Sequence, residues 1–356
     1  MNIFSKIEKA LENKLPFVVY RKPNSTLLNG LFQNNDTLYT ATNYTESGFV
    51  FAAFDDKNKA ILIPRNKAEF LQENSLNPII TDADSESKPK NHQKNKQDDR
   101  QEKAHIKLVQ KGIDAINSGL FKKVILSRKE LIKLTDFNVI SVFKKLLANY
   151  NTAFTYVWYH PKVGMWLGAT PETLVEIKEQ QFKTMSLAGT QVFKGTTNVI
   201  WQPKELEEQQ FVTDYITDKL SGICNSLEKG EVKTAKAGNL LHLKTLISGK
   251  ITTKNAVLIK KLHPTPAVCG VPLEVSKAFI LKNENYNRAY YTGFLGELNL
   301  NETSKNTSEL FVNLRCMEIK KDIAVLFIGG GITKESNPES EWLETVSKSE
   351  TMKKVL

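Results

Sequence analysis

The chain has 356 residues, 40% of them hydrophobic, so it is long enough to bury a substantial core as one large domain or two average ones. Its formal net charge of +10 favours anionic partners but does not by itself choose between nucleic acid, anionic lipid and a small dicarboxylate. The three cysteines, Cys224, Cys269 and Cys316, are widely spaced, which argues against a disulfide framework and a paired-cysteine metal site and predicts a cytoplasmic protein.

Residues 1–80 are predicted to form a short helix followed by a small strand-rich subregion. Residues 1–17 alternate apolar residues with Lys and Glu, which is typical of an amphipathic helix and unlike the apolar core of a signal peptide. The β-rich segments 17–20, 49–54 and 60–63 are separated by Asn, Asp, Gly and Pro. No apolar run is long enough to span a bilayer, so we expect no membrane partner.

Residues 81–104 are predicted to be a charged linker. The run from Asp82 to Lys111 is poor in hydrophobic residues and mixes acidic with basic side chains. A nucleic-acid-binding segment is the alternative, but such a segment would present a cleaner basic face. A solvated linker is therefore favoured, and no nucleic acid is expected as a partner.

Residues 105–356 are predicted to form the larger region of the chain, with several strands and a few helices. We expect helices at 105–117, at 274–281 and from Pro203 to about Gly230, with a last one opened by Asn337-Pro338; the strands are expected at 124–126, 154–159, 164–167, 173–177, 181–186 and 323–328. The pattern has no internal repeat and no regular alternation of strand and helix. This favours an α+β fold of antiparallel sheets flanked by helices over a doubly wound fold.

Two ionisable residues adjoin strand-like segments that could hold a catalytic group. Lys123 precedes the apolar run 124–126, where partial burial would lower the lysine pKa and create a base usable near neutral pH. A surface lysine is the ordinary alternative, and Lys122 is the competing register. Glu172 follows Pro171, whose rigid turn limits the freedom of the carboxylate; a solvated glutamate at the end of a turn is the alternative there.

Three further carboxylates lie on two predicted helices. Glu208 continues the apolar face of the helix that begins at Pro203, and Glu341, Glu344 and Lys348 are spaced to share one helical face. Each alone is more often part of a solvated salt-bridge stripe. Together they fit Mg²⁺, which prefers one or two protein carboxylates, several waters and an anionic group of the substrate.

The segment 262–270, Leu-His-Pro-Thr-Pro-Ala-Val-Cys-Gly, has two prolines and a closing glycine that predict an extended path with few hydrogen bonds. With Lys-Val-Ile-Leu-Ser-Arg at 123–128, Gly-Ala-Thr-Pro-Glu at 168–172 and Glu-Trp-Leu-Glu-Thr at 341–345, it resembles the isochorismate synthases of the chorismate-utilising enzyme family. The resemblance covers about residues 105–353 and implies that 105–356 is the chorismate-binding catalytic region. It implies antiparallel sheets packed as an α/β/β/α layered sandwich, with chorismate as the substrate.

The resemblance also implies roles for the residues above. Lys123 would deprotonate a water that attacks C2 of chorismate, and Glu172 would protonate the leaving hydroxyl at C4. Glu208 and Glu344 would bind Mg²⁺ as the cofactor, with Glu341 bound through water. Gln209 stands where the family usually has a histidine after the first glutamate.

Chorismate carries two carboxylates, so its site must supply cations and N–H donors. Arg315 is a fork-shaped donor suited to one carboxylate, and Tyr291 could add a hydroxyl to the same group. The glycines at 329–331 would let backbone approach a ligand, and their spacing does not match a dinucleotide-binding loop. The resemblance adds a Leu-Ala-Gly-Thr turn at 187–190 and implies that the substrate-binding residues are Gly189, Thr190, His242, Ala267, Tyr291, Arg315, Gly329 and Lys348.

Two positions indicate the reaction within the family. Ala188 stands where enzymes that make aminodeoxychorismate carry a nucleophilic lysine, and Ala267 stands where anthranilate and salicylate synthases usually carry threonine. The resemblance therefore implies an isochorismate synthase, an isomerase without a glutaminase subunit. Salicylate synthase is the alternative within the family, and a basic nucleic-acid-binding protein is the alternative outside it. The sequence leaves open whether the product serves menaquinone or siderophore biosynthesis.

Overall fold

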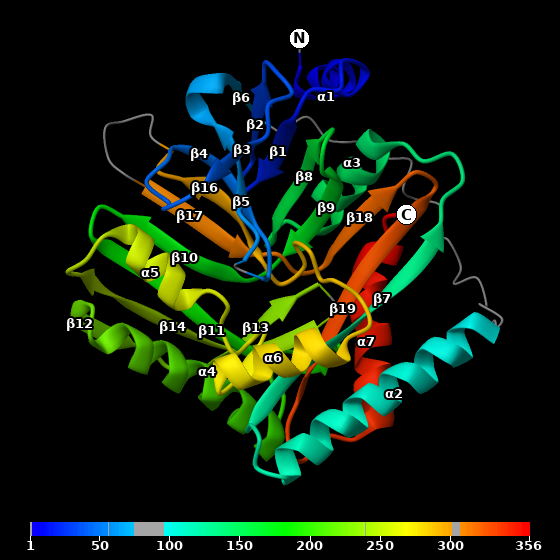
Figure 1. The fold of residues 1–356 in the computed structure, drawn as a ribbon, viewed down its shortest axis with the longest axis vertical. Helices are drawn as coiled ribbons and strands as arrows, with labels where there is room; N and C mark the ends of the chain where they lie inside the picture. The colour runs from blue at the N-terminus through cyan, green and yellow to red at the C-terminus, as the bar shows by residue number, and fades with distance from the viewer. Residues whose placement is uncertain (1, 56, 75–95, 239, 301–306) are drawn as a thin grey trace.

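The computed structural model describes residues 2–55, 57–74, 96–238, 240–300 and 307–356, whose strands form two antiparallel sheets with helices on the outer face of each (Figure 1). The helices are α1 (Ile3–Glu12), α2 (Lys96–Asn117), α3 (Val139–Asn149), α4 (Pro203–Ser221), α5 (Asn255–Leu262), α6 (Leu273–Asn283) and α7 (Pro338–Lys353), with a 3₁₀ turn at Arg65–Lys67. None of the helices in these ranges has the length and apolar run that a bilayer crossing needs.

The first sheet runs in the order β15 (Gly270–Val271), β7 (Lys123–Lys133), β19 (Ile323–Ile332), β18 (Cys316–Lys320), β9 (Gly164–Thr170), β8 (Phe154–His160), β1 (Phe17–Arg21), β2 (Leu27–Gln33) and β6 (Ala68–Asn74). The second runs in the order β12 (Cys224–Lys229), β14 (Leu240–Ile251), β11 (Gln181–Val192), β10 (Thr173–Lys178), β17 (Thr307–Val312), β16 (Phe294–Leu298), β4 (Gly48–Ala52), β5 (Ala60–Pro64) and β3 (Tyr39–Ala41), and β13 (Lys233–Ala237) also pairs with β14. Strands of residues 17–74 join both sheets, since β1 pairs with β8 and β4 pairs with β16.

The two sheets pack face to face, so strands such as β1 are buried at every position. Val18 on β1 faces the inner aromatic core, where Phe51 of β4 lies 4.9 Å from Trp158 of β8 between ring centroids. The next residue, Val19, faces the outer core beneath α1 and α3. Each fully buried large apolar side chain stabilises the fold by about 1.5–3 kcal/mol. The predicted α/β/β/α layered sandwich is therefore confirmed.

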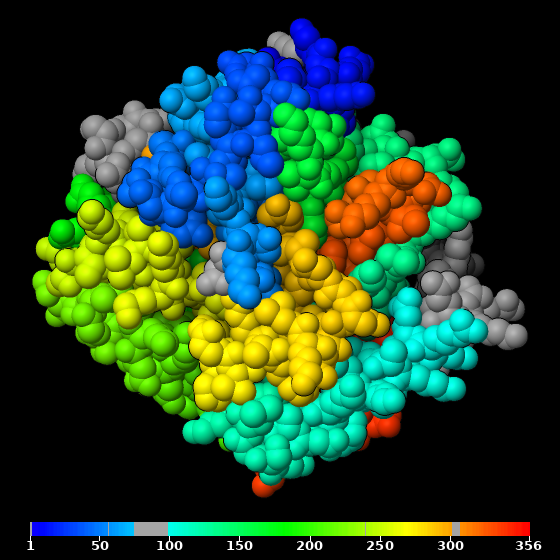
Figure 2. Space-filling view, viewed as in Figure 1, coloured from blue at the N-terminus to red at the C-terminus, as the bar shows by residue number. Residues whose placement is uncertain are grey.

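The helices that carry site residues lie at the lower end of both sheets in Figure 1. α4 and α5 pack on the second sheet, while α7 packs on β19 and beside α2. In the space-filling view of the same face, the yellow α5 and α6 lie in front of the sheets and the cyan α2 closes the lower edge (Figure 2).

Two predicted boundaries are wrong. The helix from Pro203 ends at Ser221 and is capped by Gly222, while residues 224–229, predicted as helix, pair as β12 with β14. α2 begins at Lys96 and takes in the end of the predicted linker, because a charged run also suits the solvent side of a helix whose apolar side, including Val109, is buried. The rest of that predicted linker, 81–95, lies outside the described residues.

Three local predictions also differ from the structure. The glycines at 329–331 lie inside β19, paired with β7, and not after the strand. The predicted turn at 187–190 is a bulge inside β11, where Gly189 has φ +72°. The segment 262–270 contains a turn, because the amides of Val268 and Cys269 both donate to the carbonyl of Thr265. In the two strands, pairing with neighbouring strands determines the conformation, and local residue preferences do not reveal this pairing.

Candidate active site

A cavity of about 700 Å³, counting the part that opens to solvent, lies where β7, β11 and β19 meet the turns at 263–270 and 288–293. The residues predicted for the site that line it are Glu172, Gly189, Thr190, Glu208, His242, Ala267, Tyr291, Arg315, Gly329 and Lys348. Lys123, Glu341 and Glu344 lie directly behind this lining.

Lys123 is the first residue of β7 and its side chain is fully buried. Burial lowers the pKa of its ammonium, and Glu208, whose Oε1 lies 3.1 Å from Nζ, opposes that change together with Glu172. Neighbouring Lys122 is exposed, so the surface-lysine interpretation applies to Lys122 and not to Lys123. A Cβ on the lining residue Gly331 would come within 3.3 Å of Lys123 Cε, which shows how close the amine lies to the cavity.

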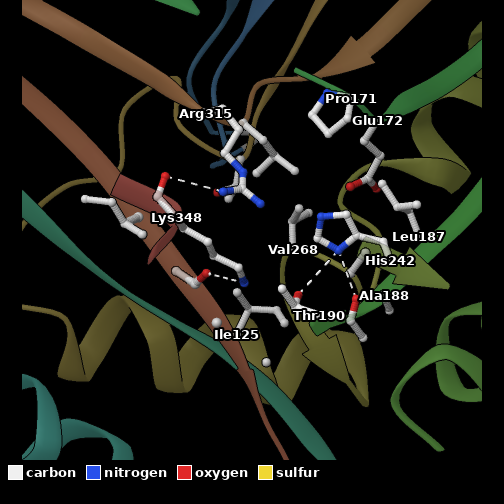
Figure 3. A pocket seen from close by; sticks show the side chains of 18 of the residues that line it. Ile125, Pro171, Glu172, Leu187, Ala188, Thr190, His242, Val268, Arg315 and Lys348 are labelled. Atoms are coloured by element: carbon white, nitrogen blue, oxygen red, sulfur yellow. Dashed lines mark hydrogen bonds between the residues drawn. The ribbon is translucent and has the colours of Figure 1, made fainter. Parts of the chain in front are cut away.

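Glu172 lies between β9 and β10 and is 3% exposed, which contradicts the interpretation of it as a solvated residue. Burial raises the pKa of its carboxyl to about 8, although the positive charge of Lys123 acts in the opposite direction. The group therefore stays protonated at neutral pH and can donate a proton. Figure 3 shows Glu172 and His242 on one side of the cavity and Arg315 and Lys348 on the other.

His242 comes from β14 and is held by the bulge of β11 opposite it. Its Nδ1 lies 2.9 Å from the carbonyl oxygen of Gly189. Because that oxygen can only accept, Nδ1 carries the proton and Nε2 is an acceptor. Burial, with the charges of Arg315 and Lys348, lowers the pKa of the imidazole to about 3, so the ring is neutral. Nε2 has no hydrogen-bond partner within the described ranges.

Two cations and a phenol form the opposite side. Arg315 adopts φ +47° after β17, and its Nη1 donates to the carbonyl of Lys348 at 3.4 Å. Lys348 Nζ donates to the carbonyl of Gly329 at 3.0 Å and to Glu344 Oε1 at 2.5 Å. A Cβ on Gly329 would lie 2.8 Å from the hydroxyl of Tyr291, so only glycine leaves that hydroxyl its place. This side suits an anionic ligand.

The three carboxylates predicted to hold a metal converge on the glycines of β19. A Cβ on Gly330 would lie 3.4 Å from Glu341 Oε2 and 3.5 Å from Glu344 Oε1, and a Cβ on Gly331 would lie 2.1 Å from Glu208 Oε1. Burial and the charge of Glu344 raise the pKa of Glu341 to about 6. Burial acts on Glu344 in the same direction, but Lys348 outweighs it and lowers the pKa of Glu344.

Lysines neutralise each of these carboxylates. Lys123 pairs with Glu208, Lys348 pairs with Glu344, and Lys204 of α4 pairs with Glu341 of α7 at 2.5 Å. Across the part of the chain that the structure describes, no group of three or more His, Cys, Asp or Glu side chains is already arranged as a metal site. Glu341 Oε2 is buried and has no hydrogen-bond partner among the residues that the structure describes. This oxygen, the other carboxylate oxygens and the glycines beside them nevertheless fit a hard cation such as Mg²⁺.

Some contributors to the site were not predicted. The apolar walls include Ile125, Val268 and Phe327, whose hydrophobicity alone gave no reason to distinguish them from core residues. Gln209 is 2% exposed, and its Nε2 donates to hydroxyls of both β11 and β14, at 2.9 Å to Ser186 and 2.7 Å to Thr245. It thereby connects the helix that carries Glu208 to two strands of the second sheet.

Comparison with known proteins gives one family and several relatives. A family model described as chorismate binding enzyme matches residues 50–356. The vibriobactin-specific isochorismate synthase of Vibrio cholerae is 29% identical over 249 residues, which cover 66% of this chain and 62% of that protein. The chain thus spans less than two thirds of the length of this relative.

Two solved structures share the fold over nearly the whole chain. A Bacillus anthracis protein described as the 2,3-dihydroxybenzoate-specific isochorismate synthase DhbC has a TM-score of 0.77 and 24% identity, with 98% of each chain covered. MenF, the menaquinone-specific isochorismate synthase of Escherichia coli, has a TM-score of 0.76 and 20% identity, covering 96% of this chain and 88% of the other. At these identities the likeness shows the fold alone.

Proposed function

Because the chain belongs to the family of chorismate-binding enzymes, we propose that it is an isochorismate synthase, an isomerase that replaces the C4 hydroxyl of chorismate by a hydroxyl at C2. The observation that carries the proposal is that two buried ionisable groups lie close enough for their charges to interact. They are Glu172, whose carboxyl keeps its proton at neutral pH, and Lys123. Those are an acid and a base at one cavity, as displacement of a hydroxyl by water requires.

Glu172 acts as the general acid. Its raised pKa of about 8 keeps the proton on the carboxyl at neutral pH, and the leaving oxygen at C4 takes that proton and departs as water. Its place beside Pro171 restricts the carboxyl to few orientations, which reduces the entropic cost of the transfer.

Lys123 acts as the general base. Burial favours the neutral amine, which takes a proton from the water that attacks C2. The negative charge of Glu208 favours the ammonium that Lys123 becomes, so the ion pair stabilises Lys123 once it has taken the proton.

The cationic side binds the two carboxylates of the substrate. Arg315 offers a planar pair of donors to one carboxylate, and Lys348 and the hydroxyl of Tyr291 are close enough to the cavity to assist. On the opposite side, Nε2 of His242 accepts a hydrogen bond from a hydroxyl of the substrate. Ala188 lines the cavity without an amine, so no lysine attacks the substrate from this position. Since the proposed nucleophile is water, the reaction needs no ammonia from a glutaminase subunit.

Mg²⁺ is the proposed cofactor, held by Glu208 and Glu344 with Glu341 bound through water. When bound, the cation would neutralise the negative charge that a substrate carboxylate brings next to these glutamates. The names of two relatives state vibriobactin-specific and menaquinone-specific uses. Isochorismate from this chain would enter siderophore or menaquinone biosynthesis.

The test is to incubate the purified protein with chorismate and Mg²⁺, without an ammonia source, and to identify the product by chromatography. Isochorismate is the expected product, with no pyruvate released. Salicylate with stoichiometric pyruvate would replace the proposal by salicylate synthase, and unchanged chorismate at full metal loading would remove the proposal. Glu172→Gln is the matched control, because it keeps the shape of the side chain and removes its proton donor.

A further inference from the structure

A second buried ion pair, Glu284 with Arg288, lies behind the cavity wall and takes no part in the mechanism above. Both side chains are 2% exposed. The pair is bidentate, since Arg288 Nε donates to Glu284 Oε2 at 2.8 Å and Nη2 donates to Oε1 at 2.6 Å. Neither residue lines the cavity.

The guanidinium of Arg288 connects three segments that do line the cavity. Nη2 donates to the carbonyl of Ile125 at 2.8 Å, and Nη1 donates to the carbonyl of Val268 at 3.0 Å and to the hydroxyl of Thr292 at 3.3 Å. With the two bonds to Glu284, each of the five N–H donors of the side chain has an acceptor. The three acceptors come from β7, the 263–270 turn and the 288–293 turn.

Glu284 makes a second contact with β7, at the position that pairs with β19. Its Oε1 accepts from both the amide and the hydroxyl of Ser127, each at 2.8 Å. Ser127 is the register partner of Gly329 on β19, whose backbone lines the cavity. Two aromatic rings also lie near the guanidinium, whose carbon is 4.6 Å from the ring centroid of Phe54 and 5.9 Å from that of Tyr291.

Stability alone is a weak reason for such a pair. Desolvation of two charges offsets most of their attraction, and well-packed apolar replacements of a buried pair are often neutral or stabilising. What apolar residues cannot supply is a rigid set of donors that holds carbonyls of separate segments at fixed distances.

We propose that Glu284 and Arg288 are positioning residues for the substrate site: they hold the wall formed by Ile125, Val268 and Thr292 in the shape that binds chorismate. This rests on the proposed function, because chorismate is the ligand in question. The wall includes Ala267, which adjoins the anchored carbonyl of Val268 and is the residue taken to distinguish isochorismate formation from pyruvate elimination. Loss of the pair therefore weakens substrate binding and leaves the acid and base in place.

The experiment compares the wild type with the double variant Glu284→Leu/Arg288→Met, which removes both charges and keeps the volume of the pair. We expect a folded protein whose KM for chorismate rises at least about tenfold while kcat stays within about threefold. Amide hydrogen exchange of residues 265–270, measured without ligand, should be at least about tenfold faster than in the wild type. Arg288→Lys, which offers three donors in place of five, should change both quantities in the same direction.

The control is Arg21→Lys. Arg21 is also a buried arginine that donates to a backbone carbonyl, that of Tyr150 at 3.1 Å, and it does not line the cavity. It should leave KM and the exchange of 265–270 at wild-type values. Wild-type KM or wild-type exchange in a folded Glu284→Leu/Arg288→Met protein overturns the positioning role. If the double variant does not fold, Arg288→Lys decides by the same two readouts. A wild type that fails to convert chorismate refutes the proposed function instead, and the exchange rates still decide whether the pair holds the wall.

Discussion

Replacing Glu172 by glutamine should abolish activity and stabilise the protein at the same time. The folded-state pKa is raised from the ordinary 4.5 to about 8, so between these values the folded protein keeps a proton that the unfolded chain releases. Ionisation of the unfolded chain therefore lowers stability progressively as pH rises from 4.5 to 8. At pH 7 the cost is 2.5 pH units at 1.36 kcal/mol each, or about 3 kcal/mol, and glutamine removes it. At pH 4 the two proteins should be equally stable.

Two assays test this reasoning. Denaturant unfolding at pH 4 and pH 7 measures the free energy of unfolding, and the variant should gain stability only at the higher pH. Turnover of chorismate should fall by about 10²–10⁴-fold, as expected for loss of a general acid. In the wild type, kcat should decline as pH rises through about 8, because the acid form is then lost. A variant with normal turnover, or one destabilised at pH 7, would refute the assignment of a buried protonated acid.

Three further predictions follow from the same geometry. Lys123→Met should lower turnover by about 10²–10⁴-fold, while calorimetry should still detect binding of chorismate. Lys122→Ala, at the exposed neighbour, should be as active as the wild type. Wild-type turnover in Lys123→Met would exclude Lys123 as the base. Chelation with EDTA should stop the reaction, and added Mg²⁺ should restore it. Calorimetry should show weaker Mg²⁺ binding by Glu208→Gln. Full turnover without a divalent cation would show that the three glutamates are not ligands of a required metal. Gly331→Ala should lose most of its turnover, because the new Cβ would lie 2.1 Å from Glu208 Oε1 and would force that carboxylate out of its place beside Lys123. Gly222→Ala, with open space around its Cβ, should keep wild-type turnover; wild-type turnover in Gly331→Ala would mean that the place of the Glu208 carboxylate does not matter.

An α+β fold of antiparallel sheets could be predicted because its strands are short, apolar and separated by strong turn residues, while the layered arrangement was implied by the family resemblance. The hairpin around residues 160–164 and the capped start of α7 at Asn337 follow from local chemistry and are confirmed. The end of α4 could not be predicted, because residues 224–229 become a strand only through pairing with β14, a partner that local preference does not reveal. The start of α2 was missed for the opposite reason, since its charged residues suit a linker and a solvated helix face equally well.

The site was predictable where a motif placed a charged residue next to an apolar strand. The apolar run after Lys123 indicated partial burial, the turn at Pro171 indicated a restricted Glu172, and the resemblance assigned their roles; both side chains are buried at the cavity. The contacts that hold the site were not predictable, because Arg288 reaches Ile125 across 163 positions of sequence and Gln209 reaches Thr245 across 36. Such connections depend on how the sheets pack, and they become visible only when the coordinates bring the segments together.

The most direct measurement of the central claim is the fate of oxygen when the enzyme converts chorismate in water enriched in oxygen-18. If Lys123 activates water and Glu172 releases the old hydroxyl, the isochorismate formed should carry the heavy isotope at C2, and mass spectrometry after short reaction times should detect one labelled oxygen in each new product molecule. Isochorismate that forms without the label would mean that the hydroxyl migrates within the substrate, and the pairing of base and acid proposed for these two residues would be wrong.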